Sequence, residues 1–429
     1  MQLYAACPER EALRNQILGL LASMHDEIPY RVWCDLVCTN PPLDRTTIPV
    51  AFAEFLQPNR TLPAWFYEQL IGDATKHVSV APAIFDLLNY GARTHGIDPH
   101  PAANRVEELR SLLGNLVGQM SKIEEGSLPA DVAPAKIAEV IGDSVALIIA
   151  LCDAMAIMQD ETVVPKLHQA MELKHRRIQT EAAAALAALG DETGKSKLVG
   201  LAEHPVARLR VLAYARELDF EDEISLEYRG DISLAESHLA MWLAESAQMA
   251  VAPSNMELID NRELNWPSYE HPVQCYLFRF EYGSDETGYS NIGISGPVTH
   301  AFVPDIKHLS LQDTYAAFAG WQTVHQEIFN VPIERAERIM STETQKLSRY
   351  LDEQDYQQTT PVALTAFFGE YALVAEVREN DSPGIAIVDE NGADWFGIGS
   401  PDQPIDWQLA LDIWRGRKLL ANFNPVTEF

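Results

Sequence analysis

The spacing of apolar residues changes near residue 250, and the change predicts two structural classes in one chain. Before this point, apolar positions recur at steps of three and four, the period of helices that pack by one face. After it, alternating aromatic and β-branched runs separated by turn residues are typical of strands. We therefore expect a helical domain over residues 1–250, followed by a Trp-rich α+β domain with an antiparallel sheet over residues 251–429.

An internal repeat marks the middle of the helical part. The acidic pair that begins at Asp160 recurs at Asp191 and again at Asp222, each time after 31 residues. Arg177 recurs as Arg208 at the same step. Each repeat predicts two helices, and the second carries a single apolar face. Such a pair cannot bury its apolar face by itself, so neighbouring pairs must stack.

The acidic turn, a Lys-Leu pair in the first helix and an Arg before an Ala-rich second helix resemble short HEAT-like repeats, most clearly over residues 145–220. The resemblance implies an α-solenoid over residues 1–250 whose early repeats have diverged, with an extended surface for binding proteins. Arg177 and Arg208 are candidates for lining its groove. The alternative is that both side chains cover helix edges and pair with the acidic turns.

The second domain shows local signals for strands, helices and turns. Ser310 and Asp313 form a capping box, and Asn391-Gly392 is a hairpin turn. A final amphipathic helix carries Trp407 on its apolar face. The expected strands cover residues 274–282, 289–294, 366–378, 384–388 and 394–398, and the expected helices cover residues 311–329, 333–355 and 405–422.

The candidate site in this domain is the segment Gly293–Phe302. Gly293 and Gly296 lack the side chains that would block a close approach at the exit of a strand, so they are candidates for ligand or partner binding together with Trp321. The alternative is that both glycines shape a bulge or turn, and that Trp321 belongs to the core.

Three titratable residues are the candidates for catalysis around this segment. His300 changes charge near neutral pH, and Glu281 on the preceding strand and His325 on the following helix are its expected neighbours. Together they would support acid–base chemistry. The sequence contains neither a phosphate-binding loop nor a nucleophile elbow.

The charge balance narrows the partners. The chain has 62 acidic and 32 basic residues, a net charge of −30, which argues against nucleic acid and against an anionic membrane. A basic protein partner would be attracted, although an acidic surface also serves solubility alone. The five cysteines are few and lack zinc spacing, so we expect a reducing cytoplasm, no metal and no cofactor.

These observations favour binding over catalysis. The leading hypothesis is a cytoplasmic protein-interaction scaffold or adaptor that binds a basic protein partner, because the repeat implies a binding surface and a catalytic signature is missing from the sequence. The alternative hypothesis is an enzyme or a small-ligand sensor, with its site in the second domain around Gly293–Phe302.

Overall fold

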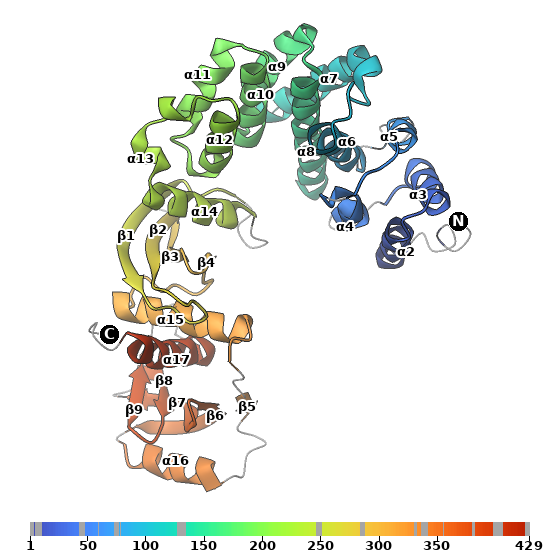
Figure 1. Ribbon diagram of the computed structural model, residues 1–429. Coiled ribbons are helices and arrows are strands. Elements are labelled where there is room, and N and C mark those ends of the chain that lie inside the picture. Colours follow the sequence, from blue (N-terminus) through green and yellow to red (C-terminus); the bar gives the residue numbers. More distant parts are fainter. Residues whose placement is uncertain are drawn as a thin grey trace. The chain divides into compact units, whose positions relative to one another are not determined.

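Figure 1 shows the computed structural model of the chain, which divides into two compact units, Met1–Ser225 and Leu226–Phe429. Each unit is described by itself. The structure describes residues 4, 11–42, 48–58, 60–72, 77, 79–126, 134–245, 251–283, 288–329, 333–335, 342–354, 356–379, 382–397 and 406–424.

The first unit is helical throughout its described residues, as the apolar spacing predicts. Its α-helices are α2 (Glu11–Ser23), α3 (Glu27–Thr39), α4 (Ile48–Ala53), α5 (Ala64–Leu70), α6 (Ala81–His95), α7 (Val106–Glu124), α8 (Pro134–Met158), α9 (Val164–Met171), α10 (Arg176–Ala188), α11 (Glu192–Leu201) and α12 (Pro205–Glu217). Short 3-10 turns are η1 (Glu54–Leu56), η3 (Ala103–Arg105), η4 (Glu161–Val163) and η5 (Glu221–Glu223).

The repeated acidic turns have the same structure in two of their three copies. The Asp160 carboxylate accepts a hydrogen bond from the Thr162 amide at 2.8 Å, and the Asp191 carboxylate accepts one from the Thr193 amide at 2.8 Å. Each aspartate therefore satisfies an amide that has no partner inside its own helical turn. Asp222 lies within η5 instead, so the third copy of the repeat is not equivalent.

The chain reverses after each long helix through one residue in the left-handed conformation. These residues are Gln159 (φ 55°), Gly190 (φ 81°) and Asp219 (φ 58°). The first two are 31 residues apart, but the third follows after 29. The expected step of 31 residues therefore holds once and then shortens, because the turn after α12 replaces the acidic cap with Phe220, which is buried.

Helix α8 combines unusual length with high hydropathy. Among the described residues, Val140–Met158 is the helical segment long and apolar enough to cross a membrane by length and composition, and 56% of that window is buried inside the protein. Core helices of soluble proteins pass the same test. Helix α8 packs against α6, α7 and α10, which accounts for its apolar character.

The second unit begins 25 residues before the boundary that the sequence predicts. Helix α14 (Asp231–Glu245), expected as the last helix of the first domain, packs on strands β1 to β4 and belongs to the second unit. The remaining helices are α13 (Leu226–Arg229), α15 (Leu311–His325), α16 (Thr342–Asp352) and α17 (Trp407–Phe423). The strands are β1 (Asn255–Leu264), β2 (Val273–Tyr282), β3 (Tyr289–Ser295), β4 (His300–Ala301), β5 (Ile333–Arg335), β6 (Gln357–Phe367), β7 (Glu370–Glu379), β8 (Ser382–Val388) and β9 (Ala393–Phe396).

The described strands form two antiparallel sheets that hold a pair of helices between them (Figure 1). The first sheet has the order β1-β2-β3-β4 and the second β5-β6-β7-β8-β9. A single core cluster joins the inner faces of both sheets to α15 and α17, for example through Ile294, Phe318 and Val374. Helix α14 covers the outer face of the first sheet, and α16 covers the outer face of the second.

Two glycines let α15 and α17 approach each other closely. A Cβ atom on Gly320 would lie 1.9 Å from the Asp412 carbonyl oxygen, and one on Gly416 would lie 1.7 Å from the Ala316 carbonyl oxygen. Because moving up one turn of α15 moves down one turn of α17, the helices run antiparallel. The contact places the side chains of both helices in fixed positions toward the neighbouring groove.

Several expected elements are confirmed and others are displaced. The Ser310 hydroxyl accepts from the Asp313 amide at 3.1 Å, and β8 and β9 form the hairpin at Asn391-Gly392. The strand expected over residues 366–378 is instead a hairpin of β6 and β7, and the sequence analysis missed β1. The helix expected over residues 333–355 begins at Thr342, after strand β5.

Candidate functional site

The second unit contains a groove of about 1060 Å³ between α14, β4, α15 and the start of α17. Its walls are largely aromatic and its polar groups are mostly carboxylates. Its lining residues include Trp242, Glu245, His300, Phe302, Trp321, His325, Ile333, Asp406, Trp407, Asp412 and Arg415. Concave sites that combine an apolar lining with a few polar groups are where proteins most often bind ligands or partner segments.

His300 lies on β4, and its ring is held by aromatic neighbours from three elements. It stacks on Trp321 of α15 with ring centroids 3.7 Å apart and an angle of 12° between the planes. Trp242 of α14 meets it edge-on at 5.3 Å. This burial, with a smaller contribution from the nearby His325, lowers the pKa of His300 to about 4. His300 is therefore a neutral aromatic wall of the groove at neutral pH.

The structure brings together some of the predicted site residues and separates others. His325 also stacks on Trp321, at 4.5 Å, so His300 and His325 share one aromatic neighbour. This follows from the spacing of Trp321 and His325, four residues apart on one helix. Glu281 is not among the residues that line the groove; its carboxylate accepts a hydrogen bond from the Asn255 side chain at 3.2 Å.

The two predicted glycines serve packing within the chain. A Cβ atom on Gly293 would lie 2.8 Å from the Leu239 side chain, so this glycine makes room for α14. Gly296 has φ 121°, and a Cβ atom there would lie 2.2 Å from the Gln274 carbonyl oxygen. Gly296 borders a smaller hollow of about 370 Å³, and neither glycine is among the residues that line the main groove. The close approach that the sequence predicts at these glycines is made by the protein's own chain.

An acidic side chain and a basic side chain of α17 reach the groove from its buried side. The Arg415 guanidinium is 1% exposed, lies 3.8 Å from the Asp412 carboxylate and donates to the Thr365 hydroxyl at 3.2 Å. Burial raises the pKa of Asp412 to about 7, Arg415 opposes the rise and Asp406 adds to it. Burial also lowers the pKa of Arg415 to about 10. Asp412 therefore changes charge near neutral pH.

The remaining carboxylates lie at the ends of helices. Asp406 accepts a hydrogen bond from the Leu409 amide at 2.7 Å and so caps α17. Glu245 is the last residue of α14 and is exposed. With Asp412 ionised, three carboxylates face one guanidinium in the described lining of the groove. The groove therefore has a negative charge above neutral pH and attracts cations.

The sequence analysis missed the part of the groove that comes from distant segments. Trp242 was assigned to another domain, and Asp412 and Arg415 were expected in a helix without a role in the site. An i, i+3 pair of acid and base on an otherwise apolar helix was the available signal. Of the tryptophans in the predicted Trp-rich domain, Trp321 and Trp407 line the groove, whereas Trp266 and Trp414 are buried in the core.

In the first unit, the predicted basic residues take part in separate contacts. Arg208 is 2% exposed, and its guanidinium donates to the carbonyl oxygens of Ala202 at 2.8 Å and Glu203 at 3.1 Å, which caps the end of α11. The expectation that Arg208 lines a binding groove is therefore wrong: it has a structural position. Arg177 is exposed at the start of α10.

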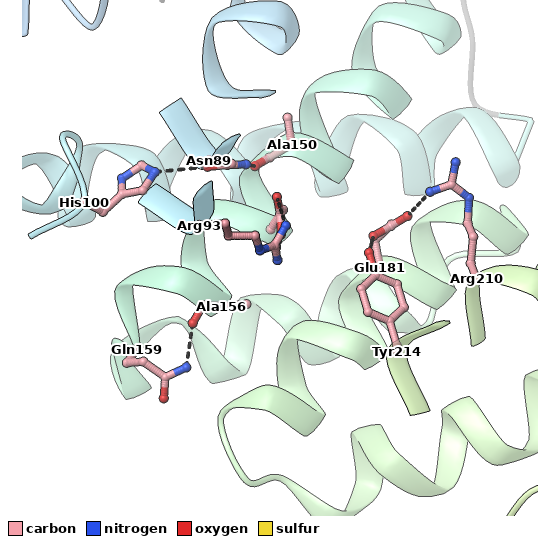
Figure 2. A network of polar contacts seen from close by, with 10 residues as sticks. Asn89, Arg93, His100, Ala150, Ala156, Gln159, Glu181, Arg210 and Tyr214 are labelled. Atoms are coloured by element: carbon pink, nitrogen blue, oxygen red, sulfur yellow. Dashed lines mark hydrogen bonds and ion pairs between the residues drawn. The ribbon is translucent and has the colours of Figure 1, made fainter. Parts of the chain in front are cut away.

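Figure 2 shows the polar contacts that link successive helices of this unit. Glu181 of α10 is 4% exposed and accepts from the Arg210 guanidinium at 2.9 Å and from the Tyr214 hydroxyl, both on α12. Asn89 of α6 donates to the Ala150 carbonyl of α8 at 3.0 Å and contacts the His100 ring at 3.0 Å. These buried contacts satisfy one another within the protein, so they position the helices.

Comparison with known proteins gives no relative for this chain: no family model, curated protein or solved structure matches it. The functional argument therefore rests on the groove itself.

Proposed function

We propose that this protein is an interaction adaptor that binds a basic segment of a protein partner in the groove of its second unit. The observation that carries the proposal is the combination of three tryptophans, Trp242, Trp321 and Trp407, with three carboxylates in the described lining of one groove. Aromatic faces attract Arg and Lys side chains through cation–π contacts, and nearby carboxylates pair with the charge.

The proposal extends to the first unit and to the location of the protein. We propose that α9 to α12 are two HEAT-like helix pairs of an α-solenoid, supported by the matching caps at Asp160 and Asp191. A cytoplasmic location is supported by the buried thiols of Cys34, Cys152 and Cys275. The net charge of −30 supports steering of a basic partner rather than of nucleic acid.

The test must separate binding in the groove from general attraction to an acidic protein. A fluorescently labelled peptide that alternates Arg, Lys and Gly is titrated with the full-length chain, and its affinity is measured by anisotropy. A peptide with Glu in place of each basic residue is the control ligand. The affinity for the basic peptide should fall with added salt, because screening shortens from about 10 Å at 0.1 M to about 3 Å at 1 M.

Matched variants locate the binding. Trp321→Ala should weaken the basic peptide about tenfold or more, as loss of an aromatic anchor does. Trp395→Ala, at a partly exposed tryptophan outside the groove, should leave the affinity unchanged. Glu245→Gln should weaken binding more than Glu263→Gln, which removes an exposed charge on β1. Equal effects within each pair would show general electrostatics and overturn the proposal.

A second candidate function has one observation in its favour. His300 and Asp412 line the same groove, and their pKa values are shifted in opposite directions, which is a feature of acid–base and ligand sites. An enzyme or small-ligand sensor would use this groove for a small molecule. A small molecule that raises the thermal midpoint of the wild type but not of Trp321→Ala, while the basic peptide fails to bind, would favour this candidate.

A further inference from the structure

The hairpin between β6 and β7 ends in a turn whose first residue is in a conformation unfavourable for its type. Phe367 pairs with Glu370, which leaves Phe368 and Gly369 as the two turn residues. Their φ angles are 51° and 80°. Positive φ at both positions matches the type I′ turn, which strongly prefers Asn-Gly. Glycine adopts this conformation freely, but a phenylalanine there is strained.

The strained side chain is also exposed. Phe368 has 49% of its surface exposed although its ring touches two other aromatic residues. The ring of Phe367 lies 4.6 Å away and that of Phe329 lies 5.8 Å away. Phe367 is buried in the core, so it fixes the base of the turn, while Phe368 projects from it. Strain at an exposed aromatic residue is not compensated by burial, which points to a use outside the folded chain.

The turn adjoins the groove through a short stretch of sheet. Ile333 lines the groove and is 41% exposed, and it pairs with Thr365 of β6. Thr365 also accepts the hydrogen bond from Arg415, which lines the groove as well. Phe368 follows Thr365 by three residues, about 10 Å along an extended chain. A segment that occupies the groove and continues past Ile333 therefore reaches the aromatic turn.

We propose that Phe368 is the apolar anchor of the same docking surface and inserts into a hydrophobic pocket of the basic protein partner. The inference rests on the proposed function of the groove. Anchors of this kind are large aromatic side chains placed next to charged contacts, and a few of them supply most of the binding energy. The partner is a protein rather than an anionic membrane, because the chain's charge of −30 opposes such a surface.

The substitution Phe368→Asn separates a docking role from a structural one. Asn suits the first position of a type I′ turn, so the thermal midpoint of the second unit should rise or stay unchanged. Phe368→Gly relieves the same strain and serves as a second variant. Phe423→Asn is the matched control, because Phe423 is 40% exposed near the end of α17. A structural role for Phe368 would instead lower the thermal midpoint.

The probe is a set of peptides selected from a phage-displayed random library on the immobilised full-length chain. We expect the selected peptides to combine basic residues with an apolar segment. Their affinity should fall about tenfold for both Phe368 variants and for Trp321→Ala, and stay unchanged for Phe423→Asn. A loss with Trp321→Ala but not with the Phe368 variants would overturn this inference and leave the groove proposal in place.

Two further outcomes would overturn the assignment differently. Equal affinity of the selected peptides for the wild type and Trp321→Ala would refute the groove proposal and, with it, the inference. Binding of the wild type to neutral phosphatidylcholine vesicles, lost in Phe368→Asn, would identify a lipid interface instead of a protein pocket and overturn the choice of partner.

Discussion

The close contact of α15 and α17 gives a sharp prediction, because it depends on the absence of one carbon atom. In Gly416→Ala, the new Cβ atom would lie 1.7 Å from the Ala316 carbonyl oxygen, whereas ordinary contacts begin at 3.4 Å. The obstacle is backbone, which cannot rotate away as a side chain can. The two helices must therefore separate by more than an ångström in the middle of the core cluster that they share with both sheets.

The magnitude follows from two opposing effects. Overpacking a core costs about 1–3 kcal/mol and sometimes more, and a clash with backbone belongs at the upper end of that range. Alanine regains about 1 kcal/mol over glycine within a helix. The free energy of unfolding of the second unit should therefore fall by about 2 kcal/mol. For a unit of about 200 residues, this lowers the thermal midpoint by about 4–8 °C.

Thermal unfolding of the full-length chain, followed by tryptophan fluorescence, measures this effect. Six of the eight tryptophans belong to the second unit, so the signal reports mainly on it. The matched control is Gly200→Ala in α11, where a Cβ atom would have no neighbour within 4 Å among the described residues. That variant should gain stability by up to about 1 kcal/mol. A Gly416→Ala protein as stable as the wild type would refute the close crossing of α15 and α17.

Three further changes test other contacts. Burial raises the pKa of Asp412 to about 7, so the folded protein keeps a proton that the unfolded chain releases near pH 4; stability should fall as pH rises from about 5 to 7 and then level off, and Asp412→Asn should flatten this slope in urea unfolding, whereas an unchanged slope would contradict the assignment. Arg208→Met should lower the free energy of unfolding by about 1.5–3 kcal/mol by removing the bonds at the end of α11, while Arg216→Met, at a 70% exposed side chain, should change it little; chemical denaturation compares the two. Asp191→Ala should cost about 1 kcal/mol as the loss of a helix cap, and Asp222→Ala should cost less; equal losses of thermal stability would restore an equivalent third repeat.

The parts of the fold that were predicted correctly depend on residues close together in the sequence. The cap at Ser310 needs an amide three residues away, and the hairpin at Asn391-Gly392 needs a turn that its own residues favour. The pair Trp321 and His325 shares a helix face for the same reason. His300 was expected near a cavity because it follows a strand, and the structure places it on the wall of the groove.

The errors arose where local signals were weak or misleading. The turn at Phe368 was missed because a phenylalanine in a type I′ turn is unfavourable, so the hairpin was predicted as one strand. Helix α14 has the apolar spacing of the preceding helices, and the sequence assigned it to the same domain. Its apolar face packs on the first sheet instead. The step of 31 residues continued in the sequence to Asp222 although the turn had already shortened.

The amino-acid sequence by itself determined the helical and mixed parts of this chain, because the periods of apolar residues report on neighbours within a few positions. It did not determine the groove. Trp242, His300, Trp321 and Arg415 come from segments separated by tens of residues, and only the stacking of two sheets around α15 and α17 brings them together. That stacking depends on how whole faces fit, such as the close approach at Gly416, and a distance of this kind between distant segments leaves no periodic trace in the sequence.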